Sequence, residues 1–62
     1  MNQVEKMAQA VRNVGFVAEI KNNRVYVSLS TRRIGRYEAY DVPGTTDENL
    51  HYDKYGRVYI SC

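Results

Sequence analysis

The feature that most constrains the fold is a pair of alternating apolar segments on either side of Asn22-Asn23. Asparagine tolerates a positive φ, so this dipeptide suits a two-residue type I′ hairpin loop. With those two residues as the loop, Ile20 faces Val25 and Ala18 faces Val27. Directly opposed residues share one face of a sheet. These apolar pairs therefore predict a hairpin of two strands, residues 16–21 and 24–30, with one buried face.

The same argument predicts a second hairpin near the C-terminus. Lys54-Tyr55-Gly56 forms a common three-residue bulged loop if Gly56 is left-handed. The residues that then oppose each other on the buried face are Tyr52 with Val58 and Leu50 with Ile60. A short helix through residues 47–52 competes with the first strand of this hairpin. Residues 46–52 are therefore left open between helix and strand.

An amphipathic helix is predicted at the N-terminus. Its apolar stripe has helical spacing and consists of Val4, Met7, Ala8, Val11 and Val14. Asn2 can cap the first turn, and Gly15 stands where a helix end favours a left-handed residue.

Residues 36–42 are expected to form a third strand whose register is ambiguous. Either Tyr37 and Ala39 or Tyr40 and Val42 face the core, and the first choice keeps Glu38 out of it. Pro43-Gly44 ends this strand. The expected fold class is thus α+β: one domain, residues 1–62, with an N-terminal amphipathic helix packed on one face of a 4–5-stranded antiparallel sheet. The expected core consists of Val4, Met7, Val11, Val14, Phe16, Ala18, Ile20, Val25, Val27, Leu29, Leu50, Tyr52, Val58 and Ile60.

The chain is short and carries a single cysteine, Cys62, so no internal disulfide is available. A small domain without disulfides fits a reducing compartment, and the N-terminus lacks the apolar middle of a signal peptide. We therefore expect a cytoplasmic protein with no membrane segment (host cytoplasm, if a phage encodes it). The charge is polarised: residues 19–40 sum to +3, whereas residues 41–53 sum to −4.

The first candidate site is the sheet face that the helix leaves uncovered. Its expected residues are Arg24, Tyr26, Arg57, Tyr59 and, with the preferred third-strand register, Tyr40. Tyrosine and arginine are enriched at the energetic centres of protein interfaces. Aromatic rings among arginines also bind single-stranded nucleic acid. The plainer interpretation is that tyrosine is a good strand former and that arginine packs its stem across it.

Two of these strands share a sequence pattern. The segment Lys21-Asn22-Asn23-Arg24-Val25-Tyr26-Val27-Ser28 resembles Lys54-Tyr55-Gly56-Arg57-Val58-Tyr59-Ile60-Ser61, with five of eight positions identical. Each segment is a turn followed by a strand, with Arg, Tyr and Ser on one face.

Two other segments are weaker candidates. Arg32, Arg33 and Arg36 lie in a basic loop that suits phosphate binding, although a solvated loop explains them as well. The acidic stretch of residues 41–53 suits a basic partner, or simply a solvated loop.

No catalytic motif is evident. His51 is the only histidine, Cys62 is terminal, and neither a phosphate-binding glycine loop nor a metal-ligand spacing occurs. We expect a protein that is not an enzyme and has no cofactor or metal.

The leading functional hypothesis is a small protein-binding module, an adaptor or inhibitor of a host macromolecular complex, that acts through its Tyr/Arg-rich sheet face. Chains of this size without catalytic residues are common in phages and mobile elements, and anti-CRISPR proteins are often of this build; this is an analogy from size. The alternative is a nucleic-acid-binding regulator that uses the same face with the loop of Arg32, Arg33 and Arg36. A homodimer formed through an edge strand or the open face is a third alternative.

Overall fold

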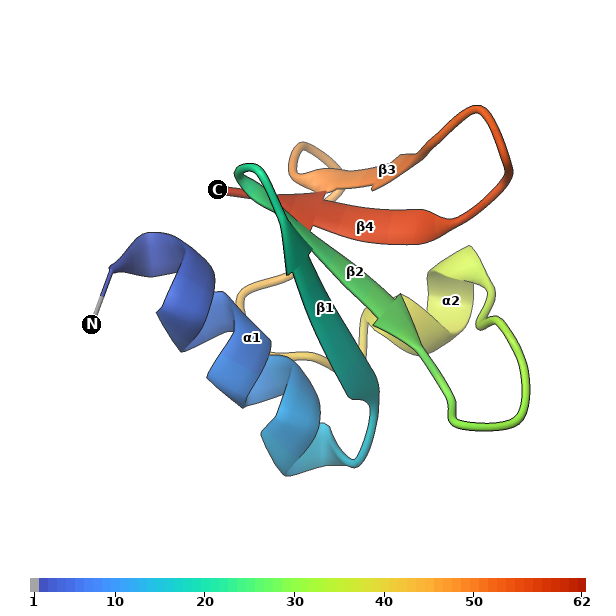
Figure 1. Cartoon of the computed structure of the whole chain (residues 1–62), viewed down its shortest axis with the longest axis horizontal. Coiled ribbons are helices and arrows are strands. Elements are labelled where there is room, and N and C mark those ends of the chain that lie inside the picture. The colour runs from blue at the N-terminus through green and yellow to red at the C-terminus, as the bar shows by residue number, and fades with distance from the viewer. Residues whose placement is uncertain (1) are drawn as a thin grey trace.

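The computed structural model describes residues 2–62. Its elements are α1 (Gln3–Val14), β1 (Val17–Lys21), β2 (Arg24–Ser28), α2 (Arg36–Ala39), β3 (Leu50–Tyr52) and β4 (Val58–Ser61) (Figure 1). The four strands form one antiparallel sheet in the order β1-β2-β4-β3. The α+β fold predicted from the sequence is confirmed. No helix in the described part of the chain is long and apolar enough to cross a membrane.

Both predicted hairpins are confirmed, register included. Ile20 pairs with Val25 in the first hairpin, and Leu50 pairs with Ile60 in the second. Residues 50–52 are therefore strand, and the chain reaches them through a turn closed by the bond from Leu50 N–H to the Thr46 carbonyl. The first loop departs from the expected type I′ turn. That turn needs a positive φ at both loop residues, and only Asn22, at 57°, has one.

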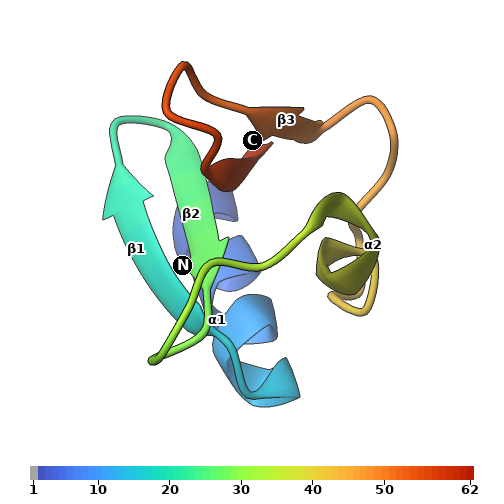
Figure 2. The ribbon, with the colours of Figure 1, turned by 90° about the vertical axis from the view of Figure 1, so that its right-hand side faces the viewer.

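Helix α1 has the predicted ends. The Asn2 side chain accepts a hydrogen bond from the Glu5 N–H at 2.8 Å, and Gly15 adopts a φ of 105°, which suits glycine. The helix packs against the β1–β2 hairpin, and α2 is displaced from it towards the side of β3 (Figure 2).

The core lies between the helices and one face of the sheet. Its buried residues come from both helices, three strands and two connecting segments: Ala8, Val11, Val25, Val27, Ile34, Ala39, Val42, Leu50, Val58 and Ile60. Because inward residues alternate along each strand, the residues between them point to the opposite face. That opposite face carries the candidate site.

The predicted third strand is wrong, because residues 36–39 form the short helix α2. Glu38 stabilises its start by accepting a bond from the Gly35 N–H at 3.5 Å. A helix does not alternate its side chains as a strand does. Ala39 and Val42 are therefore both buried, while Tyr37 is 87% exposed.

Three other residues expected in the core lie nearer its edge. Val14, Ile20 and Tyr52 are between 39% and 49% exposed. Val14 is the last residue of α1, Ile20 lies near the free tip of the first hairpin, and Tyr52 ends its strand. Four buried residues are absent from the expected core: Ala8, Ile34, Ala39 and Val42. Ala8 lies in the predicted apolar stripe of α1, and the other three lie in or beside the helix α2, which was not predicted.

Candidate functional site

The centre of the open sheet face is formed by two tyrosines on neighbouring strands. Tyr26 on β2 lies directly opposite Tyr59 on β4, and their ring centroids are 5.3 Å apart with the planes tilted by 41°. This is the offset, tilted arrangement that aromatic pairs favour. His51 on β3 lies beyond Tyr59, with a centroid distance of 5.4 Å. Three neighbouring strands thus present a row of rings.

Arg24 binds both tyrosines. Its guanidinium carbon lies 4.4 Å from the centre of the Tyr59 ring, in cation–π geometry, and its Nη1 donates to the Tyr26 hydroxyl at 3.3 Å. The bond to Tyr26, followed by the field of Tyr59, raises the pKa of this guanidinium. Arg24 is therefore a permanent cation held in place on an aromatic surface.

The two similar sequence segments explain this cluster. They form the first hairpin turn with β2 and the second hairpin turn with β4, and β2 and β4 pair with each other antiparallel. The equivalent residues Tyr26 and Tyr59 pair with each other at one end of this ladder, so each copy of the pattern contributes one ring to the cluster. Arg24 and Arg57 are also equivalent. Sequence reasoning found the similarity but not the strand order that brings both copies together.

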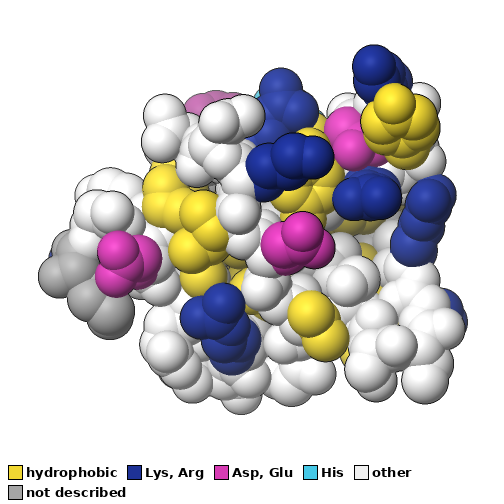
Figure 3. All heavy atoms as spheres, in the orientation of Figure 1, with side chains coloured by type: hydrophobic (Ala, Val, Ile, Leu, Met, Phe, Trp, Pro, Cys, Tyr) yellow, Lys and Arg dark blue, Asp and Glu magenta, His cyan; other side chains and the backbone are white. Residues whose placement is uncertain are grey.

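A hollow of about 470 Å³ runs across this face between the two hairpin turns. We call it the Tyr/Arg groove. It is lined by both central tyrosines, by Arg24 and Arg57, and by residues of the two turns, including Lys21, Asp53, Lys54 and Tyr55. Its volume is within the range of ligand-binding clefts. Figure 3 shows Lys and Arg side chains gathered around hydrophobic ones on this side of the molecule.

The groove carries an excess of positive charge. Asp53 is its only carboxylate, and its Oδ1 accepts backbone N–H bonds from Tyr55 at 2.9 Å and Arg57 at 2.8 Å. Desolvation raises the pKa of Asp53, but these two bonds and the nearby Arg57 charge outweigh it and hold that pKa below its usual value. Asp53 is thus a structural acceptor of the hairpin turn, and four cations remain around the groove.

The loop arginines do not act as one group. Arg32 forms a bidentate ion pair with Glu38 at 3.0 Å, and Arg36 pairs with Asp47 at 3.5 Å. The bond to Arg32 lowers the pKa of Glu38. Only Arg33 turns towards the second hairpin, where its Nη1 donates to the Tyr55 carbonyl at 2.8 Å.

Tyr40 is not on the open face, so its predicted place in the site is wrong. It directly follows α2, is half-buried, and packs against the core. Its hydroxyl donates to Asp47 Oδ1 and accepts from Arg36 Nε at 3.3 Å. The predicted register assumed a strand at residues 36–42, in which side chains alternate between the two faces of the sheet. Residues 36–39 form a helix instead, so that alternation does not apply.

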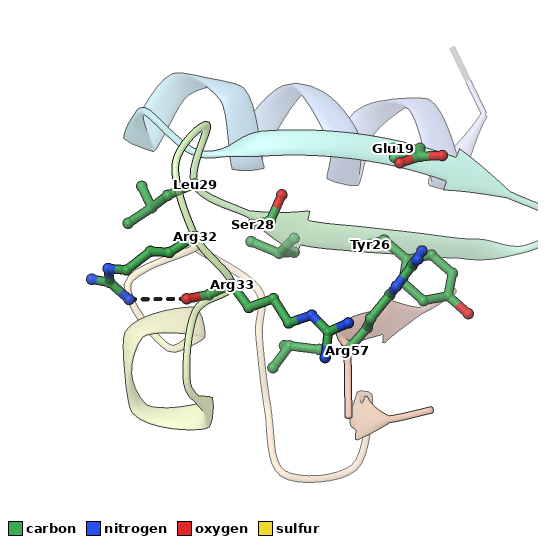
Figure 4. A pocket seen from close by; sticks show the side chains of 9 residues that line it. Glu19, Tyr26, Ser28, Leu29, Arg32, Arg33 and Arg57 are labelled. Carbon is green, nitrogen blue, oxygen red and sulfur yellow. Dashed lines mark hydrogen bonds between the residues drawn. The ribbon is translucent and has the colours of Figure 1, made fainter. Parts of the chain in front are cut away.

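A second hollow, of about 360 Å³, lies beside the groove and shares Tyr26 and Arg57 with it. We call it the arginine hollow. Arg32, Arg33 and Arg57 line it together with Ser28, Leu29 and Glu19 (Figure 4). The chain forms it by folding back after β2: Leu29 N–H donates to the Arg32 carbonyl at 2.9 Å, and Ser28 bridges to Arg33.

No protein-family model, curated protein or solved structure matches this chain. A function for it therefore has to be inferred from its own side chains. Among residues 2–62, no group of three His, Cys, Asp or Glu side chains is placed to hold a metal ion.

Several residues that line the groove or extend its aromatic row were not among the predicted site residues. Lys21, Lys54 and Tyr55 line the groove from the hairpin turns, and His51 extends the aromatic row. The signal was present for the lysines, since each occupies the first position of one of the two similar segments. Tyr55 is 63% exposed at the turn, where the Lys54 ammonium lies 5.2 Å from the centre of its ring.

Proposed function

We propose that this chain is a protein-binding module, an adaptor or inhibitor of a larger macromolecular complex, that binds its partner through the Tyr/Arg groove. The observation that carries the proposal is the assembled cluster of Arg24 on Tyr26 and Tyr59. Tyrosine and arginine are the residues that most often dominate binding energy at interfaces. A cluster already held by its own contacts loses little side-chain entropy when a partner docks.

An analogy of build suggests one class of such modules. Inhibitors of host defence complexes encoded by phages, such as anti-CRISPR proteins, are often built as one small domain. The groove is a hollow between two hairpin turns, into which a side chain of a partner can insert.

The first test is capture of partners from lysate with tagged protein. Tyr59→Ala removes the ring that contacts Tyr26, His51 and Arg24, so we expect recovery of the partner to fall by about tenfold or more. Tyr37→Ala is the matched control, because Tyr37 is 87% exposed on α2, away from the groove. A partner recovered equally by wild type, Tyr37→Ala and Tyr59→Ala would contradict the proposal.

Single-stranded nucleic acid is the second candidate ligand, and one observation favours it. Six cations line the two hollows, and among residues 2–62 five of them have no carboxylate within ion-pair distance: Lys21, Arg24, Arg33, Lys54 and Arg57. The sixth, Arg32, pairs with Glu38. Arg32 and Arg36 are paired with acidic side chains, which argues against nucleic-acid binding by Arg32, Arg33 and Arg36 together. Anisotropy of labelled single strands separates the two candidates: nucleic-acid binding falls roughly tenfold or more between about 50 and 200 mM salt.

A further inference from the structure

We infer that the arginine hollow is a carboxylate-binding site, and that it receives an Asp or Glu side chain from an acidic segment of the protein partner. The inference rests on the proposed function and adds the chemistry of the segment that binds.

Arg33 is held in place by a contact that leaves most of its donors free. Its Nη1 bonds to the Tyr55 carbonyl, and the same atom would lie 3.9 Å from a Cβ placed on Gly56. The guanidinium is thus fixed against the turn of the second hairpin. Since a guanidinium has five N–H donors, this bond leaves the others available for an anion.

Arg57 adds the second guanidinium. Its backbone N–H is fixed by the Asp53 carboxylate, and its side chain lines both the arginine hollow and the Tyr/Arg groove. Figure 4 shows Arg33 reaching from its loop towards Arg57, whose side chain continues past Tyr26. An anion in the hollow would meet donors from two separate segments of the chain, Arg33 of the loop after β2 and Arg57 of the second hairpin turn.

The distribution of acidic side chains leaves these two arginines for a partner. Arg32 and Arg36 in the neighbouring loop are neutralised by Glu38 and Asp47. Among residues 2–62, neither Arg33 nor Arg57 has a carboxylate within ion-pair distance. Glu19 also lines the hollow, but it lies at the far end from Arg33, on β1 (Figure 4). The positive potential is therefore concentrated at the Arg33 end.

The walls of the hollow favour an acidic side chain over a run of phosphates. Leu29 is partly exposed and supplies apolar surface, and Ser28 supplies a hydroxyl beside the guanidiniums. Methylene groups of a Glu or Asp side chain can pack on Leu29 while the carboxylate bonds to arginine in forked geometry. A volume of about 360 Å³ accommodates one such side chain with part of its backbone.

The test uses labelled octaglutamate and octaglutamine peptides with the intact chain in about 20 mM salt, where weak charge pairs are least screened. We expect octaglutamate alone to bind. Amide shifts in ¹H–¹⁵N spectra of the wild type should centre on residues 28–33 and 57. Arg33→Gln and Arg57→Gln should each weaken binding by about fivefold or more. Glu19→Gln should tighten it by about twofold, because it removes a like charge.

Lys6→Gln is the matched control. It removes one positive charge from the exposed face of α1, outside both hollows, and should leave the affinity unchanged to within about twofold. Circular dichroism confirms that each variant is folded. Three results would each overturn the inference: no shift at residues 28–33 or 57, equal weakening by Lys6→Gln, or binding of labelled single-stranded DNA but not of octaglutamate.

The capture experiment separates this inference from the proposed function. If recovery of the partner falls with Tyr59→Ala but is the same for Arg33→Gln and wild type, the carboxylate site is contradicted and the protein-binding proposal is supported. If recovery is the same for Tyr59→Ala and wild type, the proposed function is contradicted.

Discussion

At the scale of single residues, Asp53 shows how the site depends on one short acceptor side chain. Its carboxylate bonds to the N–H groups of Tyr55 and Arg57, and its own N–H bonds to the Arg57 carbonyl at 2.9 Å. Gly56 completes the turn with a φ of 80°, a conformation that glycine adopts without strain. These bonds orient Tyr55 and Arg57 towards the groove, so a residue of the turn also organises the binding surface.

The pKa of Asp53 provides a test at this scale. The pKa of the Asp53 carboxyl is lower in the folded protein than in the unfolded chain. In the unfolded chain an Asp carboxyl has a pKa of about 3.9. The ionised form therefore adds stability that is complete above that value and is lost as pH falls through the folded pKa. We expect the wild type to lose more stability than Asp53→Asn between pH 7 and pH 2.5, measured by urea unfolding. A carboxyl ¹³C titration with a midpoint above about 4 would contradict this account.

At the scale of elements, the two hairpins could be predicted because each is specified locally. A short loop of Asn or Gly residues sets the register, and apolar pairs such as Val25 with Ile20 confirm which face is buried. The register in turn places Arg24, Tyr26 and Tyr59 on the open face. This part of the candidate site could therefore be predicted from the sequence alone.

The helix α2 and the arginine hollow could not be predicted from local sequence in the same way. Residues 36–42 fit a strand or a helix by composition, and the choice depends on the contacts of Ile34, Ala39 and Val42 with the core. Glu38, three residues after Gly35, was the one local sign of a helix start. Arg33 and Arg57 line one hollow because the loop folds back onto Ser28 and because Arg33 bonds to Tyr55, which is 22 residues away in sequence.

The central strand β4 provides a stability test at the element scale. Ile60 is completely buried and pairs with both Val25 and Leu50. Ile60→Ala should lower the free energy of unfolding by about 2–5 kcal/mol, through lost burial and the cavity that remains. Ile20→Ala is the matched control, since Ile20 is 43% exposed and should cost less than about 1 kcal/mol. Urea unfolding that gives equal losses for the two variants would contradict the assigned core.

At the scale of the whole molecule, the charge asymmetry seen in the sequence is partly cancelled on folding. The acidic stretch of residues 41–53 contributes Asp47 to Arg36 and Asp53 to the second hairpin turn. What remains positive is the open face and the adjoining part of the arginine hollow, where Tyr26 and Tyr59 lie beside cations such as Arg24 and Arg57 that form no ion pair among the described residues. Figure 3 shows Lys and Arg side chains around hydrophobic ones on this side of the molecule. One side of a small domain thus combines the aromatic surface and the charge that a partner of opposite sign would bind.

The most direct test of the central claim is site-specific photo-crosslinking from the two sides of the molecule. A photoreactive residue replaces Lys54, which lines the groove, or Lys6, which is exposed on α1. Each protein is irradiated in lysate, and the covalent adducts are compared by mass. The account predicts a protein adduct from position 54 that is absent from position 6 and disappears with Tyr59→Ala. An adduct from position 6 alone would place the binding surface on the helix and contradict the account.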